Sequence, residues 1–151
     1  MSGVLQGKAF GSASTLVAQM GILLGMVVSN QTQSALVVAS AASAISGSFG
    51  DAFSIYISET TGKRDDPLIA ASSVLITKLV IGAVYVSIFM FFGNSKYTLV
   101  IATLLTLFLL YYLSMIANPT EVNKTFVQFV TLTLVVVSIT SSFGYAVRNS
   151  F

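Results

Sequence analysis

The chain has 151 residues, of which 55% are hydrophobic and 8% are charged, and its formal net charge at neutral pH is +2. Soluble domains carry about 25% charged residues, so this composition cannot cover a water-exposed surface and predicts an integral membrane protein. The absence of cysteine and histidine excludes a disulfide framework, a Cys/His zinc site and a cysteine nucleophile, and the small net charge without a basic run makes nucleic acid an unexpected partner.

Five apolar segments follow one another along the chain, and each is close to or longer than the ~20 residues that cross a bilayer. Backbone groups in lipid must be hydrogen-bonded within the segment, so each segment is expected to be an α-helix. The connections between them are short and polar, and no domain boundary is visible. The sequence therefore predicts an all-α fold, a single five-helix transmembrane domain over residues 1–151 in the lipid bilayer. The predicted helices cover residues 9–29, 35–58, 68–92, 97–117 and 125–147.

The distribution of basic residues predicts the orientation of the chain, because cytosolic loops carry an excess of lysine and arginine. With the N-terminus in the cytosol and the C-terminus outside or in a lumen, four basic residues lie inside and two outside. The inner set is Lys8, Lys63, Arg64 and Lys124, and the outer set is Lys96 and Arg148.

The first predicted helix is rich in small residues, which allow helix backbones to approach closely in lipid. Gly21 and Gly25 form a G-x-x-x-G motif on this helix, and it serves either packing within the chain or a homodimer contact. Ser14 and Gln19 add a short polar patch.

The second predicted helix carries a stripe of small and polar residues. The set Ser43, Gly47, Gly50, Asp51, Ser54 and Ser58 follows an i, i+3, i+4 pattern, which places it on one helix face. The stripe either packs against another helix, with Gly47 and Gly50 as close-approach positions, or lines a wet path.

Two ionisable residues, Asp51 and Lys78, fall well inside the second and third predicted helices. A charge at the centre of a spanning helix costs on the order of 3 kcal/mol or more, so it normally faces a partner. Asp51 precedes the connection between the two helices by about 14 Å of helical rise, and Lys78 follows it by about 16 Å. An antiparallel hairpin could therefore pair them, either as a structural ion pair or as an ion path with Lys78 as a tethered counter-charge.

The connection over residues 59–67 carries three acids, Glu59, Asp65 and Asp66, interspersed with two bases. Carboxylates suit hard cations, so these acids and Asp51 form a weak candidate metal set beside the alternative of a solvated loop. The fourth helix is bulky and apolar all round, which favours a position facing lipid.

Four segments of the chain form a recognisable series. They are AFGSASTLVAQMGILLGM in the first helix, SAISGSFGDAFSIYISE in the second, DPLIAASSVLITKLVIGA in the third and SSFGYAVRNSF at the end. Together they resemble the vacuolar iron transporter family of Fe²⁺/Mn²⁺ exporters. The resemblance implies a homodimer with a metal path between the two first helices, and proton-coupled export of Fe²⁺ or Mn²⁺ from the cytosol.

The chain departs from the family pattern at the positions that bind metal. The family's helix-one aspartate falls on Ser14, its helix-two methionine on Asp51 and a nearby glutamate on Ile55. In place of the family's acidic cytosolic insert the chain has only ETTGKRDDP, as in a short divergent member.

Two functions follow as hypotheses. The first is a transporter-like membrane protein, which the helix order favours. The second is a non-transporting structural protein of a larger membrane assembly, or of a virus internal membrane, which the missing acids and Lys78 favour. With no nucleophile–base pair and no cofactor motif, an enzyme is not expected, and no cofactor is indicated beyond Fe²⁺ or Mn²⁺ as a transported ion.

Overall fold

The computed structural model describes residues 3–62, 66–93 and 96–150, with the backbone alone for residues 3–8 and 10. Lys63, Arg64 and Asp65 lie outside the described residues. The described chain forms five helices, which confirms the predicted all-α fold, and their bounds differ from the predicted ones by six residues or fewer. They are α1 (Gly3–Val28), α2 (Gln33–Thr61), α3 (Pro67–Phe92), α4 (Lys96–Ala117) and α5 (Val122–Ser150).

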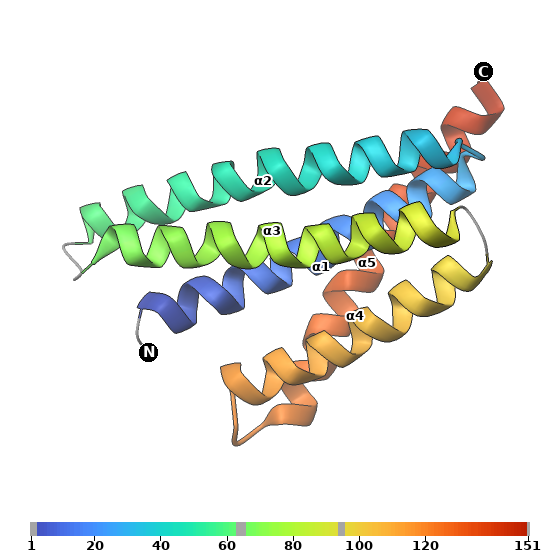
Figure 1. Ribbon diagram of the computed structural model, residues 1–151. Coiled ribbons are helices and arrows are strands. Elements are labelled where there is room, and N and C mark those ends of the chain that lie inside the picture. Colours follow the sequence, from blue (N-terminus) through green and yellow to red (C-terminus); the bar gives the residue numbers. More distant parts are fainter. Residues whose placement is uncertain (1–2, 63–65, 94–95, 151) are drawn as a thin grey trace.

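Each of the five helices is long and apolar enough to cross a membrane, as the sequence predicts for a multi-pass membrane protein. The N- and C-terminal ends lie at opposite ends of the bundle (Figure 1). This agrees with an odd number of spans.

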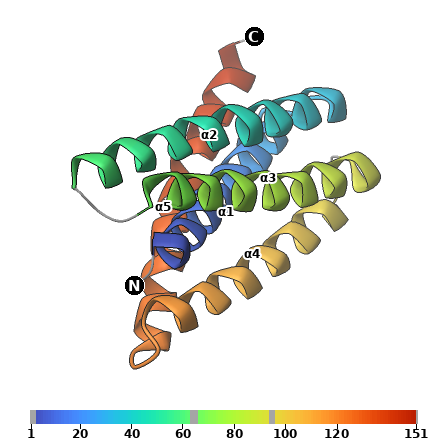
Figure 2. The ribbon, with the colours of Figure 1, turned by 60° about the vertical axis from the view of Figure 1, so that its left-hand side comes forward.

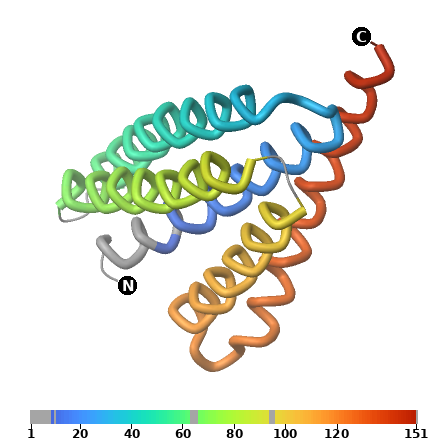
Figure 3. Tube along the Cα trace, turned by 45° about the vertical axis from the view of Figure 1, so that its right-hand side comes forward, coloured from blue at the N-terminus to red at the C-terminus, as the bar shows by residue number. Residues whose placement is uncertain are grey.

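Helix α1 is the centre of the bundle, because it packs against each of the other four helices. The α2–α3 hairpin lies on one side of it and the α4–α5 hairpin on the other (Figures 2 and 3). The two hairpins meet each other through α3 and α4, and the described parts of α2 make no contact with α4 or α5. A side-chain contact that joins α1 to the α2–α3 hairpin therefore lies in the part of the bundle formed by α1, α2 and α3.

The helix ends follow the local sequence. Thr32 caps α2, where its side chain accepts a hydrogen bond from the backbone N–H of Ala35 at 3.2 Å, a bond that satisfies one of the free donors at a helix start. Pro67 opens α3, where a missing N–H costs nothing. Gly93 ends α3 at a φ of +63°, a conformation that glycine adopts without strain. These signals set where α2 begins and where α3 begins and ends.

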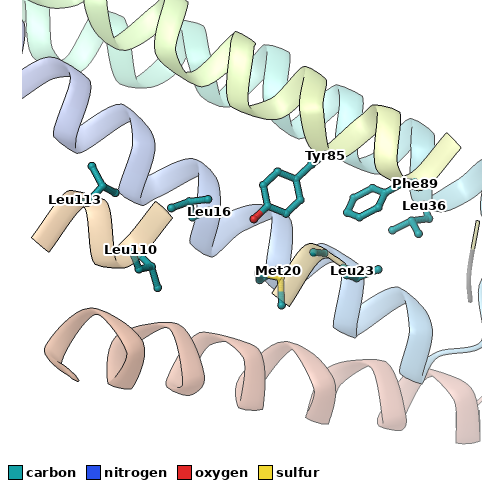
Figure 4. Close-up of a cluster of buried hydrophobic side chains, with 9 residues drawn as sticks. Leu16, Met20, Leu23, Leu36, Tyr85, Phe89, Leu110 and Leu113 are labelled. Atoms are coloured by element: carbon teal, nitrogen blue, oxygen red, sulfur yellow. The ribbon is translucent and has the colours of Figure 1, made fainter. Parts of the chain in front are cut away.

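The apolar core lies between α1, α2, α3 and α4 (Figure 4). Leu16, Met20 and Leu23 of α1 meet Tyr85 and Phe89 of α3 there. The other members are Leu36, Ala102, Leu110 and Leu113.

Helix α4, whose apolar sequence favours a position facing lipid, is exposed on one side and buried on the other. Thr98, Ala102 and Thr106 are buried, whereas Leu104 and Phe108 on the other side are 62% and 68% exposed. The small side chains spaced four residues apart let α4 approach the bundle on one face. The helix with the fewest buried residues is α5.

The α2–α3 contact has no spare room at Gly82. A Cβ at this position would lie 2.5 Å from the Cβ of Ala44. We expect Gly82→Ala to destabilise the bundle by about 1–3 kcal/mol, the usual cost of overpacking. Adding Ala44→Gly should recover much of this loss, as measured by unfolding in mixed detergent micelles. A Gly82→Ala variant as stable as the original protein would contradict the tight contact.

Candidate functional site

Asp51 of α2 and Lys78 of α3 form an ion pair in the middle of the bundle. The Nζ atom of Lys78 lies 2.5 Å from Oδ2 of Asp51, as their similar predicted depth suggested. The Lys78 side chain is 6% exposed and that of Asp51 is 31% exposed. The Lys78 side chain is therefore buried, while that of Asp51 is partly exposed.

A third helix reaches the same pair through Ser14 of α1. The Ser14 hydroxyl donates a hydrogen bond to Oδ2 of Asp51 at 3.1 Å and accepts one from Nζ of Lys78 at 3.1 Å. Ser14 belongs to the polar patch that the sequence indicated on the first helix. Together Ser14, Asp51 and Lys78 form the candidate site, called the three-helix polar centre below.

Two glycines leave room for the Lys78 side chain. A Cβ at Gly47 of α2 would lie 3.4 Å from Nζ of Lys78. A Cβ at Gly11 of α1 would lie 3.3 Å from Cγ of Lys78 and 3.1 Å from the backbone oxygen of Val74. Gly47 was among the predicted close-approach positions, whereas Gly11 was not.

The predicted stripe on α2 is divided between two environments. Gly47 and Asp51 face α3, and Ser43 is half-buried. Ser54 is exposed and its hydroxyl bonds to the backbone oxygen of Gly50 in its own helix at 2.9 Å. Gly50 has no neighbour within 4 Å for a Cβ to meet, so the prediction that it serves helix packing is wrong for the described chain.

The buried face of α2 is one that the stripe did not include. Leu36, Ser40, Ala44, Ser48 and Ala52 are buried at intervals of four residues. This spacing is visible in the sequence and could have identified the face. The small side chains explain how α2 packs closely against α1 and α3.

Gln19 of α1, which the sequence placed in the polar patch, forms a second buried contact with α2. Its side-chain N–H donates to the backbone oxygen of Ser40 at 3.2 Å, and the Ser40 hydroxyl donates to its oxygen. Gln19 and Ser40 are both fully buried. This pair fixes α1 against α2 nearer the start of α2 than the three-helix polar centre does.

The G-x-x-x-G motif of α1 packs within the chain. Cβ atoms at Gly21 and Gly25 would each lie 3.4 Å from atoms of Thr140 in α5. Of the two alternatives for the motif, internal packing is the one this structure shows. A homodimer through the first helix stays a prediction, and it would have to use another part of the α1 surface.

The described acids of the weak metal set, Glu59 and Asp66, do not gather around Asp51. Glu59 lies at the end of α2, about 12 Å of helical rise from Asp51, and is 4% exposed. Asp66 precedes α3 and is exposed, while Asp65 is outside the described residues. Across residues 3–62, 66–93 and 96–150 there is no group of three acidic, histidine or cysteine side chains placed to hold a metal ion.

The three-helix polar centre can hold a proton or a small cation at one carboxylate in exchange for a tethered ammonium group. Its hydroxyl can serve as a further oxygen ligand or as a hydrogen-bond donor.

Comparisons with protein-family models, with curated protein sequences and with solved structures give no match for this chain.

Proposed function

We propose that the protein is a cation transporter-like membrane protein in which Asp51 is the ion-handling group. The observation that carries this proposal is the 2.5 Å ion pair between Asp51 and Lys78 at mid-helix depth, in which the Asp51 side chain is 31% exposed. Ionisable groups inside spanning helices commonly mark ion or proton pathways.

Lys78 supplies the resting counter-charge. Its ammonium group occupies the place on Asp51 that an incoming cation would take, and a proton on Asp51 would release it as well. Because α1, α2 and α3 all meet at this centre, displacement of Lys78 would change the packing of three helices at once. Such a bistable contact is what a transport cycle needs.

Fe²⁺ and Mn²⁺ are proposed as the transported ions on the sequence resemblance, with proton coupling and a homodimer. The hydrogen bond between Ser14 and Asp51 supports the alignment behind this proposal. Ser14 stands at the position of the family's helix-one aspartate, and it lies against the residue proposed to handle the ion. Manganese favours sites with several oxygen ligands, so the hydroxyl of Ser14 would be one of the oxygens that complete the site. A cytosolic N-terminus is proposed on the lysine and arginine distribution.

The direct test is uptake of Fe²⁺ and Mn²⁺ into proteoliposomes, with a pH-sensitive dye inside to follow protons. We expect the original protein to exceed empty liposomes, and Asp51→Asn to fall to their level because the exchangeable carboxylate is gone. Asp51→Leu with Lys78→Met removes both charges, so it separates loss of transport from the cost of an unpaired lysine.

Glu121→Gln is the matched control, because it removes a carboxylate from an exposed ion pair with Lys124 outside the core. This variant should keep the flux of the original protein. A double variant that folds and still transports would remove Asp51 from the mechanism. Flux of the original protein equal to that of empty liposomes would reject the transporter proposal.

The second candidate is a structural membrane protein, and the burial of Lys78 favours it. The Lys78 side chain is 6% exposed, and its positive charge would repel a cation that moves past Asp51. A buried ion pair can also fix helix register without any transport role. In that case the flux would be absent, and the protein would be recovered from its native membrane in a fixed ratio to neighbouring proteins.

A further inference from the structure

The α4–α5 groove is a pair of adjoining cavities on the opposite side of α1 from the bulk of the α2–α3 hairpin. One cavity of about 440 Å³ is lined by residues of α1, α4 and α5, Ser14 among them. A second cavity of about 260 Å³ continues along α1 as far as Leu24. Leu110 and Thr133 line both cavities, so the two form one groove interrupted by these side chains.

The lining of the groove is almost entirely carbon. Three of its four hydroxyl groups are bonded elsewhere, and the fourth, that of Thr103, belongs to an exposed residue. Thr133 donates to the backbone oxygen of Phe129 at 2.8 Å and Thr106 to that of Ala102 at 2.7 Å. Ser14 is bonded to Asp51. A cavity with few polar partners stays dry and takes apolar ligands, so the groove suits an apolar ligand better than water, an ion or a polar solute.

The position of the groove sets which apolar molecules can reach it. Its lining residues lie in the interiors of three helices, each long enough to span a membrane. Leu132 and Leu134 at its rim are 62% and 58% exposed. At this depth the surrounding medium is the hydrocarbon of the lipid chains.

The shape of the groove favours a narrow and flexible occupant. From Ser14 to Leu24 it follows about 15 Å of helix, and the side chains of Leu110 and Thr133 divide it into cavities of about 440 Å³ and 260 Å³. A flexible chain can follow this interrupted space, whereas a straight helix about 10–12 Å across cannot pass the two side chains.

We propose that the α4–α5 groove binds one acyl chain of a bilayer lipid. The acyl chain lies along α1 between α4 and α5 and covers the Ser14 side of the three-helix polar centre. Because the chain leaves one apolar medium for another, binding gains packing rather than hydrophobic transfer. The preference over bulk lipid is therefore severalfold and depends on chain length.

The protein contains no tryptophan, so each single-tryptophan variant reports on one place in the structure. Phe129→Trp puts a reporter in the groove, and Phe108→Trp puts one on the lipid-exposed side of α4, where Phe108 is 68% exposed. Both are reconstituted in mixtures of phosphatidylcholine with its chain-brominated form, a quencher of tryptophan fluorescence. Leu132→Trp at the exposed rim replaces the first reporter if Phe129→Trp does not fold.

We expect the groove reporter to be half-quenched at a severalfold lower fraction of brominated lipid than Phe108→Trp, with a dependence on chain length that Phe108→Trp lacks. Adding Ala18→Phe, which fills the groove from α1, should remove this excess quenching and leave the Phe108→Trp variant unchanged. Identical quenching curves for the two reporters would overturn the proposal. So would a groove reporter that brominated lipid does not quench.

Discussion

Asp51→Leu is expected to lower the free energy of unfolding by about 3–5 kcal/mol, because it leaves the buried ammonium group of Lys78 without its partner. Asp51→Leu with Lys78→Met should be close to the original protein in stability, since replacing both members of a buried pair with apolar residues is often neutral or stabilising. Unfolding of the single and double variants in mixed detergent micelles measures both values.

The control for this prediction is the exposed ion pair of Glu121 and Lys124, whose side chains are 52% and 66% exposed. Glu121→Gln should cost at most about 1 kcal/mol, as exposed pairs do. If Asp51→Leu proved no more costly than Glu121→Gln, the pair at the centre of the bundle would not hold the helices together. A double variant as unstable as the single one would mean that the charge on Lys78 is not the cause.

Gly144→Ala should separate α5 from α1. A Cβ at Gly144 would lie 2.4 Å from the carbonyl oxygen of Gly25, and neither backbone can give way without moving a helix. We expect a loss of about 3 kcal/mol or more, at the upper end of overpacking costs, measured by the same unfolding assay.

Gly50→Ala is the matched control, because the space around Gly50 is open. It should be neutral or stabilise by up to about 1 kcal/mol, since alanine favours the helix. Equal stability of the Gly144→Ala and Gly50→Ala variants would show that the α1–α5 contact tolerates a wider spacing.

Much of the fold can be read from the sequence, because apolar segment length and polar breaks determine where helices begin and end. The Asp51–Lys78 pair is predictable for a similar reason: consecutive spans run antiparallel, so depth follows from counting residues. Ser14 could be assigned to a polar patch but not to this pair, because its place depends on how α1 crosses the hairpin. No residue count gives that crossing.

The faces of α2 were harder to predict. The stripe in the sequence placed Gly50 and Ser54 on the predicted contact face, yet the structure buries Ser40 and Ser48 instead. In lipid, apolar and small residues can both lie inside or outside, so polarity does not mark the inner face as it does in water. The recurrence of small residues every four positions is the stronger signal of the buried face, and α4 shows the same pattern.

The central position of α1 has a consequence for how the protein assembles. The first helix of this chain to enter the membrane meets its last partner, α5, only after the other three helices have been inserted. Ser14 and Gln19 gain their partners as soon as α2 is inserted, whereas Gly21 and Gly25 face lipid instead of Thr140 until α5 follows. The contacts that hold α1 against α5 therefore form last and close the bundle. An early pause in synthesis would leave a polar, small-residue helix open to any neighbour in the bilayer.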